Sequence, residues 1–241
     1  MLRLILMGLC GLMMSRAGRA QSVPATPTDK SLMVNAVGNN ANPVVRTLDD
    51  RYEGLQGTPY FLNEWLTGQV ELTDGRRYTN VPLKFDAYRQ ELTLLRPSMR
   101  SDSIVIARPT VGRFSLTNTD GGTYSFERFP AVKTSDAALK DGYFMVLYAG
   151  KTTLLKRIAK TFKPANYRGG YSVDVRYDAY DNVFSYYVLK PDQTLTKVKL
   201  GKKALLEVLS DRADALKSYA DKAVVKTEAD AVALVEQYDK L

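Results

Sequence analysis

Carboxylates are the acid–base candidates that remain in this chain once its composition is considered. The 241 residues include no histidine and a single cysteine, Cys10. This composition excludes Ser-His-Asp and Cys-His catalysis, Cys/His zinc sites, haem and iron–sulfur ligation, and disulfide bonds. We therefore expect no cofactor and no metal site.

Three aspartates lie close together, Asp174, Asp178 and Asp181, and Asn182 follows them. Their spacing does not match the D-x-[DN]-x-[DN]-G loop that binds calcium. A glycosidase would need two carboxylates about 5–10 Å apart in a cleft, and Asp86 is a further candidate for such a pair. A carboxylate-based glycan-active enzyme is therefore the alternative function.

A run of basic residues between Asp141 and Asp174 contains no acidic residue and is interleaved with tyrosines. Such a stretch could bind an anionic glycan, the phosphates of lipopolysaccharide or an envelope protein, or it could be a solvated face. No motif for nucleic-acid binding accompanies it, so we expect no nucleic acid as partner. A helix over residues 151–163 would gather the central basic residues on one side, whereas a strand would divide them between two faces. The candidate ligand-binding residues are Lys156, Arg157, Lys160, Lys163, Tyr167, Arg168 and Tyr171.

The segment Gly150-Lys151-Thr152 follows a predicted strand and has the ending of a phosphate-binding P-loop. That loop requires a glycine five residues before Gly150, so that consecutive backbone N–H groups can surround a phosphate. Position 145 is a methionine, Met145. We therefore expect no nucleotide site.

The first 20 residues have the pattern of a secretory signal peptide. Arg3 precedes an apolar run of 11 residues from Leu4 to Met14, and small residues at Gly18 and Ala20 suit a signal peptidase. The run is shorter than the roughly 20 residues that span a bilayer, so it predicts no transmembrane segment, and lipid attachment at Cys10 is an alternative. The sequence thus predicts export to the periplasm or the cell exterior.

The rest of the chain divides into three parts. Residues 21–45 are rich in Pro, Thr, Asn and Ala and predict a flexible linker. Residues 46–201 alternate apolar and polar positions, with turn signals at Asp74-Gly75 and Asp120-Gly121-Gly122, so they predict a β-rich body. Two β subunits, 46–135 and 141–201, are an option within it, and a strand carrying Tyr171, Val173, Val175 and Tyr177 is expected.

The apolar period changes to 3.6 from residue 202 onward. Ser210 and Thr227 are the predicted N-caps of two helices, and Leu234, Val235 and Tyr238 share one face of the last helix. The predicted fold class is α+β and mainly β. We expect an antiparallel meander, roll or barrel-like sheet that a C-terminal helical buttress, residues 202–241, packs against.

One short sequence occurs twice, as residues 84–88 (KFDAY) and residues 176–180 (RYDAY). The repeat could mark a duplicated β unit, or it could reflect a shared preference of Asp-Ala-Tyr for turns.

Several segments carry a likeness to known proteins: residues 51–60 (RYEGLQGTPY), 68–75 (GQVELTDG) and 81–88 (VPLKFDAY), and the ending with Lys202-Lys203 and Tyr238. In these segments the chain resembles uncharacterised exported β-rich proteins of Gram-negative bacteria. The resemblance implies export and a β body with a helical tail, and no activity. We predict an exported, non-enzymatic envelope protein with a binding or structural role, in contact with an anionic surface component or a partner protein.

Overall fold

The computed structural model describes residues 53–96, 102–167 and 174–241. Residues 50–241 form one compact unit. The predicted signal peptide 1–20, the predicted linker 21–45 and the candidate residues Arg168 and Tyr171 lie outside the described residues. Within the described ranges, no helix combines the length and the apolar character needed to cross a membrane.

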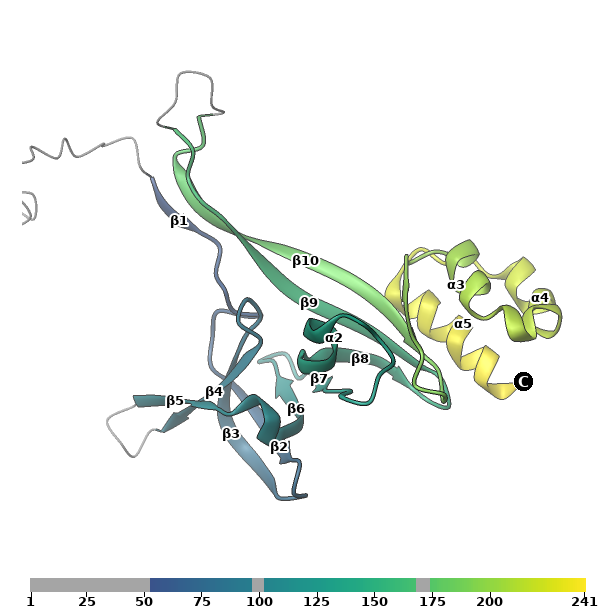
Figure 1. The fold of residues 1–241 in the computed structure, drawn as a ribbon, viewed down its shortest axis with the longest axis horizontal. Coiled ribbons are helices and arrows are strands. Elements are labelled where there is room, and N and C mark those ends of the chain that lie inside the picture. Colours follow the sequence, from purple (N-terminus) through teal and green to yellow (C-terminus); the bar gives the residue numbers. More distant parts are fainter. Residues whose placement is uncertain (1–52, 97–101, 168–173) are drawn as a thin grey trace, which may run out of the picture. The chain divides into compact units, whose positions relative to one another are not determined.

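The described chain is mainly β and its strands join one mixed sheet in the order β1-β10-β9-β8-β7-β6-β2-β3-β4-β5, with β11 also paired to β10 (Figure 1). Apart from the parallel pair β1–β10, the paired strands are antiparallel. The predicted mainly β fold with a meander is confirmed, and the sheet is not closed into a barrel. The strands are β1 (Gly54–Gln56), β2 (Leu66–Leu72), β3 (Arg77–Asp86), β4 (Glu91–Arg96), β5 (Asp102–Ile106), β6 (Val111–Thr117), β7 (Thr123–Glu127), β8 (Phe144–Ala149), β9 (Thr153–Lys163), β10 (Tyr177–Leu189) and β11 (Leu195–Val198).

Glycines make the two predicted hairpin turns, as the turn signals indicated. Gly75 has φ +88° between β2 and β3, and Gly121 has φ +87° between β6 and β7. Left-handed backbone of this kind favours glycine because it has no Cβ to clash. Of the expected strand through Tyr171, Val173, Val175 and Tyr177, the first two residues lie outside the described residues, Val175 makes an isolated bridge to Asn166, and Tyr177 begins β10.

Residues 153–163 are a strand, which decides between the two conformations that the sequence left open. β9 and β10 pair without interruption from Lys163–Ala179 to Thr153–Leu189. The apolar residues that fit a helical face are thereby divided, with Leu154 and Ile158 on one face of the sheet and Leu155 on the other.

Buried side chains lie on both faces of the sheet in separate clusters. The first core is built on β2, β3, β4, β6 and β7 around Phe85, Phe114 and Phe126, and Ile158 of β9 joins it. A smaller cluster around Phe144 and Tyr187 packs against the short helix α2 (Ala137–Asp141), which follows the 3₁₀ turn η1 (Arg108–Thr110) in the chain.

The C-terminal helices pack on the ends of β8–β11 and form a core of their own with Leu154, Val188 and Val198 (Figure 1). Leu234 and Val235 are fully buried there, as their helical spacing predicted. The elements are α3 (Lys202–Val208), the 3₁₀ turn η2 (Ser210–Arg212), α4 (Ala213–Lys222) and α5 (Glu228–Lys240).

The two predicted helix caps have different outcomes. Thr227 is the N-cap of α5, and its hydroxyl accepts from the backbone N–H of Asp230, whose carboxylate accepts in return from the N–H of Thr227. Ser210 does not cap α4, because it begins the 3₁₀ turn η2 and Arg212 stands at the N-cap position.

The Gly150-Lys151-Thr152 segment is a turn between β8 and β9 that α5 holds in place. The Asp239 carboxylate accepts from the backbone N–H of Thr152 at 3.0 and 3.1 Å. A Cβ at Gly150 would lie 2.2 Å from that carboxylate and 2.6 Å from the Tyr148 hydroxyl. The glycine of this motif therefore serves the docking of the last helix.

Asp211 joins the helices to the end of β10, and its pKa predicts an acid-dependent loss of stability. Its carboxylate accepts from Lys190 Nζ at 2.8 Å and from the Tyr238 hydroxyl at 2.5 Å, and these bonds lower its pKa from 3.8 to about 2. A lowered pKa means that the stabilisation is complete above pH about 4 and is lost as the pH falls through about 2. Because the side chain is about half exposed, we expect about 1 kcal/mol.

The measurement is chemical denaturation of the Asp211→Asn variant between pH 2 and pH 6. The variant should lose stability relative to the wild type at pH 6, and the difference should shrink towards pH 2. Glu64→Gln, an exposed glutamate in the segment before β2 whose side chain has no hydrogen bond or ion pair in the described residues, should show no such trend. A difference that stays constant with pH would contradict the interpretation.

Candidate functional site

The strand conformation of β9 divides the predicted basic residues between the two faces of the sheet. Lys156 and Lys160 lie on the face that carries Ile158, and Arg157 and Lys163 lie on the opposite face. Tyr167 follows β9 and is buried. The structure therefore does not bring these residues together on one surface.

Three of the basic side chains already have partners in the protein. Lys156 Nζ lies 2.6 Å from a Glu228 carboxylate oxygen of α5, and Lys163 Nζ lies 2.5 Å from Asp181 of β10. Arg157 donates to the backbone carbonyl of Ala138 in α2 at 2.5 Å, and burial lowers its pKa. A run without acidic residues in the sequence is thus partly neutralised by residues from other elements.

Lys160 has a different environment. Its side chain has neither an ion pair nor a hydrogen bond in the part of the chain that the structure describes. Burial lowers its pKa from 10.5, because partial removal from water disfavours the ammonium form. Among the described basic residues of the predicted set, Lys160 is therefore the one that can offer its charge to a ligand.

Aromatic side chains surround Lys160 on its face of the sheet. Phe162 pairs with Tyr180 and Ile158 with Phe184, on either side of the Lys160–Asn182 pair. The Tyr180 ring lies 5.2 Å from Phe162 and 5.3 Å from Tyr88, which follows β3. We call Tyr88, Phe162, Tyr180 and Phe184 the aromatic strip.

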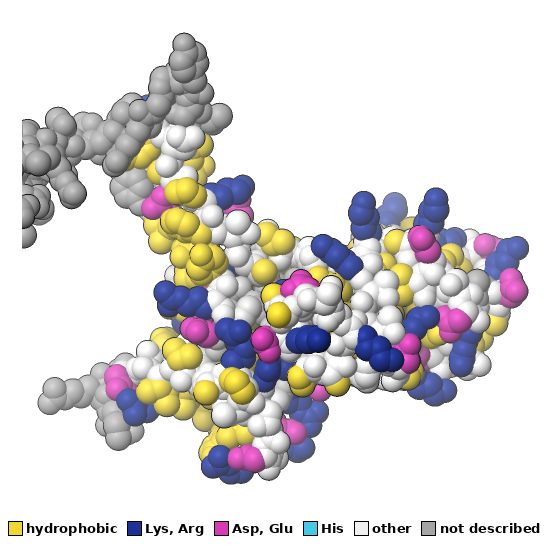
Figure 2. All heavy atoms as spheres, in the orientation of Figure 1, with side chains coloured by type: hydrophobic (Ala, Val, Ile, Leu, Met, Phe, Trp, Pro, Cys, Tyr) yellow, Lys and Arg dark blue, Asp and Glu magenta, His cyan; other side chains and the backbone are white. Residues whose placement is uncertain are grey.

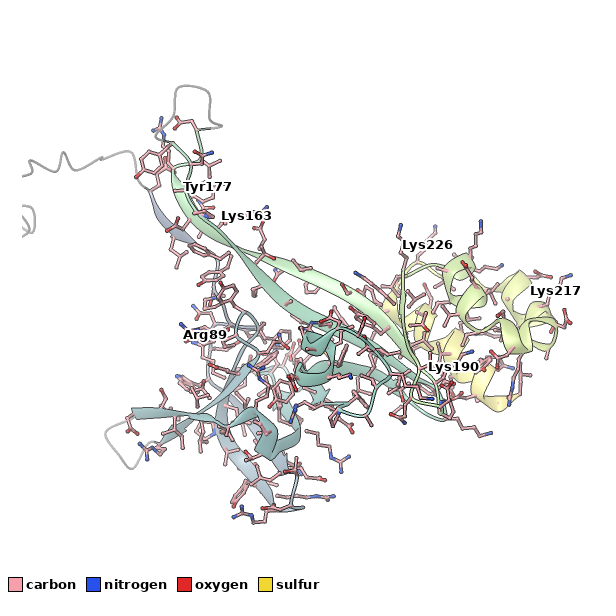
Figure 3. The ribbon with its side chains drawn as sticks, viewed as in Figure 1. Arg89, Lys163, Tyr177, Lys190, Lys217 and Lys226 are labelled. Atoms are coloured by element: carbon pink, nitrogen blue, oxygen red, sulfur yellow. The ribbon has the colours of Figure 1, made fainter. Side chains whose placement is uncertain are left out.

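The aromatic strip lies beyond the buried cores, and its side chains reach solvent. Phe184 is 50% exposed, Tyr88 46% and Phe162 38%, although all are large aromatic residues. Figure 2 shows hydrophobic side chains gathered over the ends of β9 and β10 that lie away from the C-terminal helices. In Figure 3, Lys163 and Tyr177 mark that end of the hairpin, whereas Lys190 lies near the helices.

The aromatic strip was not predicted from the sequence, because residues 151–163 are compatible with both a helix and a strand. The signal was present: Phe162, Tyr180 and Phe184 occupy alternate positions in two segments that can pair as strands. What no spacing could provide is the pairing of the two strands, which places Phe162 opposite Tyr180.

A polar groove of about 440 Å³ lies on another part of the sheet, where β8 separates from β7. These two strands pair only at Phe126–Met145 and Glu127–Phe144 among the described residues, and they diverge beyond that point. The groove is lined by side chains on the solvent face of β2, β6 and β7 and by residues 146–149 of β8.

Two carboxylates line this groove, and their pKa values are shifted in opposite directions. Glu71 forms ion pairs with Arg113 at 2.9 Å and Arg77 at 2.7 Å, and the Arg113 hydrogen bonds lower its pKa. Burial raises the pKa of Glu127 above its ordinary value, although Arg113 acts in the other direction. The Glu127 carboxylate has neither an ion pair nor a hydrogen bond within the described ranges.

The aspartates singled out from the sequence do not line this groove. Asp86 accepts from the backbone N–H groups of Tyr88 and Arg89 in the turn after β3, and Asp178 accepts from that of Ala165. Asp174 pairs with Arg176 at 2.9 Å, and Asp181 pairs with Lys163. No group of three or more acidic residues that could hold a metal ion occurs in the described residues.

The two copies of the Asp-Ala-Tyr sequence have different structures. Asp86 ends β3 and begins a turn, whereas Asp178 lies inside β10. The two tyrosines that follow, Tyr88 and Tyr180, nevertheless meet in the aromatic strip.

Comparisons with known proteins matched no family model, no curated protein and no solved structure.

Proposed function

We propose that this chain is an exported, non-enzymatic envelope protein that binds a partner protein through the aromatic strip. The observation that carries the proposal is the exposure of Phe162 and Phe184 beside Lys160. Lys160 is partly buried, and its side chain has no hydrogen bond or ion pair in the described chain. Contiguous exposed aromatic side chains are typical of protein interfaces, where Tyr and Phe are enriched.

The chemistry of the strip defines the partner surface that would fit it. The rings offer an apolar contact, and Lys160 offers one positive charge in a partly desolvated position. A carboxylate on the partner would pair with this ammonium group, and burial of the rings around the pair would strengthen it. The expected partner surface therefore carries apolar side chains next to an acidic residue.

The neighbouring charges support the choice of Lys160 as the contact. Lys156 lies 4.6 Å from the centre of the Phe184 ring, but Glu228 already neutralises it. Lys163 and Arg157 lie on the other face of the sheet. Binding of a dense polyanion such as lipopolysaccharide requires several Lys or Arg side chains without ion pairs on one face. A protein partner is therefore favoured over an anionic glycan.

The alternative, a glycan-active enzyme, would have to use the groove with Glu71 and Glu127. Glycoside hydrolysis needs a carboxylic acid and a free carboxylate on either side of the bond. The raised pKa of Glu127 suits the acid, but two arginines engage Glu71. We therefore propose binding and not hydrolysis.

A photo-crosslinking phenylalanine at position 184, in the protein expressed in its own host, should give a discrete adduct with a second protein after irradiation. The same residue at position 219 is the matched control, because Tyr219 is a 37% exposed aromatic residue on α4, away from the strip. Lys160→Glu should reduce the adduct at position 184 about tenfold, since it places like charges together.

Equal adducts at positions 184 and 219, or none at either, would contradict the proposal. An adduct that carries lipopolysaccharide and no protein would identify the anionic surface component as the ligand. Circular dichroism of each variant should match the wild type, because Phe184 and Tyr219 reach solvent and the Lys160 side chain has no hydrogen bond or ion pair to lose in the described residues.

A further inference from the structure

We propose that the groove between β7 and β8 is a binding site for a saccharide that carries a primary ammonium group, such as an oligomer of glucosamine. This site lies on different elements from the aromatic strip, and it does not depend on the protein partner proposed for the strip. Three features support it: the groove's polar floor, a carboxylate without a side-chain hydrogen bond or ion pair in the described residues, and an aromatic wall.

The floor of the groove consists of two rows of side chains that cross three strands. The register pairs Gln69 with Ser115 and Ser115 with Ser125, which forms the first row. Residues at these positions point to the face opposite the first core, because Phe114 and Phe126 between them are buried. An amide and two hydroxyls thus lie side by side, and each can both donate and accept a hydrogen bond.

The second row supplies the charge. Arg113 pairs with Glu71 on one side and stands opposite Glu127 on the other. The Arg113 guanidinium donates three hydrogen bonds to the Glu71 carboxylate, with N···O distances of 2.9 to 3.0 Å. The guanidinium of Arg113 therefore bonds to Glu71. No Lys or Arg side chain donates a hydrogen bond to the Glu127 carboxylate in the described residues.

The carboxylate of Glu127 is the complement of an ammonium group. Burial raises its pKa, which means that the ionised form is poorly solvated in its present surroundings. A cation in the groove would replace the missing solvation with a charge-assisted hydrogen bond. Charge complementarity therefore favours a cationic ligand over a neutral or anionic one.

The wall of the groove favours a sugar over a peptide. Tyr148 of β8 lines it and packs against the core of the C-terminal helices. Burial and the neighbouring Asp239 raise the pKa of its hydroxyl. An aromatic ring beside a floor of short hydroxyl and amide groups suits a ring with many hydroxyls, which stacks its apolar face and bonds through its edge. The volume of about 440 Å³ falls within the range of small-molecule sites.

The test is isothermal titration of the full chain with the tetramer of glucosamine and, separately, with the tetramer of N-acetylglucosamine. The two probes share their length and hydroxyl pattern, but acetylation removes the positive charge. Glu127→Gln keeps the shape of the side chain, and Glu64→Gln, an exposed glutamate in the segment before β2, is the matched control. Tri-lysine is the third probe, because it carries the charge without the sugar.

We expect the glucosamine tetramer to bind at least about tenfold more tightly than the acetylated tetramer, and about tenfold more tightly to the wild type than to Glu127→Gln. Glu64→Gln should bind as the wild type does. The melting temperature of Glu127→Gln should equal or exceed that of the wild type, because the variant removes a poorly solvated charge.

Three results would overturn the proposal: no binding of the glucosamine tetramer, equal binding of the charged and acetylated tetramers, or unchanged binding by Glu127→Gln. Equal binding of tri-lysine would also overturn it, since the groove would then recognise charge alone. None of these results bears on the crosslinking at position 184, so the two proposals can fail separately.

Discussion

Replacement of Leu234 by alanine is expected to lower the free energy of unfolding by about 3 kcal/mol and the melting temperature by about 6–12 °C. Leu234 is fully buried between α5 and the core that includes Leu154 and Val188. Removal of its side chain leaves a cavity in a closely packed region, and the loss of buried area adds to the cost of the cavity. Thermal unfolding followed by circular dichroism measures the effect.

Val224→Ala is the matched control for this prediction. Val224 lies between α4 and α5 and is 64% exposed, so its truncation should change the free energy of unfolding by less than about 0.5 kcal/mol. Equal melting temperatures for Leu234→Ala and the wild type would show that α5 does not pack on the sheet in solution. The helix would then be available to a partner.

Gly68→Ala is expected to destabilise the β body by about 2–3 kcal/mol. Gly68 is in β2, between β3 and β6, and a Cβ there would lie 2.3 Å from the backbone oxygen of Ser115 and 2.7 Å from Leu83 Cδ1. The backbone oxygen belongs to a paired strand and cannot move without loss of hydrogen bonds. The strands must therefore separate to accept even a methyl group.

Gly112→Ala provides a control in the neighbouring strand. Its Cβ would lie 3.5 Å from the Glu71 oxygen, which is an ordinary contact. We expect less than about 0.5 kcal/mol of change, or a small gain, because alanine restricts the unfolded chain more than glycine does. Similar urea midpoints for the two variants would contradict the close approach of β2 and β6 at Gly68.

Much of the fold was predictable from local patterns. The alternation of apolar and polar residues predicted a β body, and three of its apolar positions, Val70, Phe114 and Phe126, lie in the interior of the first core. The turn glycines Gly75 and Gly121 were identifiable because their backbone conformation disfavours other residues. The last helix could be predicted from its 3.6 period and its cap, Thr227, since both depend on neighbours within one turn.

Predictions failed or stayed open where the local pattern was compatible with two structures. Leu154 and Ile158 fit a helix as well as a strand, and the pairing with β10 decided for the strand. Ser210 is a good N-cap residue, but the chain forms a 3₁₀ turn there in which Asp211 bonds to Lys190 and Tyr238. Long-range contacts of this kind override propensity.

The sequence by itself determined that the chain lacks histidine-based and cysteine-based chemistry, that its body is β and that its tail is helical, because these follow from composition and short-range periodicity. Only the tertiary structure decided which charges are free. Lys156 and Glu228 are 72 residues apart in the chain and 2.6 Å apart in space, whereas the side chains of Lys160 and Glu127 have no hydrogen bond or ion pair in the described residues. Spacing along a strand fixes the face on which a side chain lies, but its neighbours in space are set by the order of the strands and the docking of the helices, which bring together residues far apart in the chain.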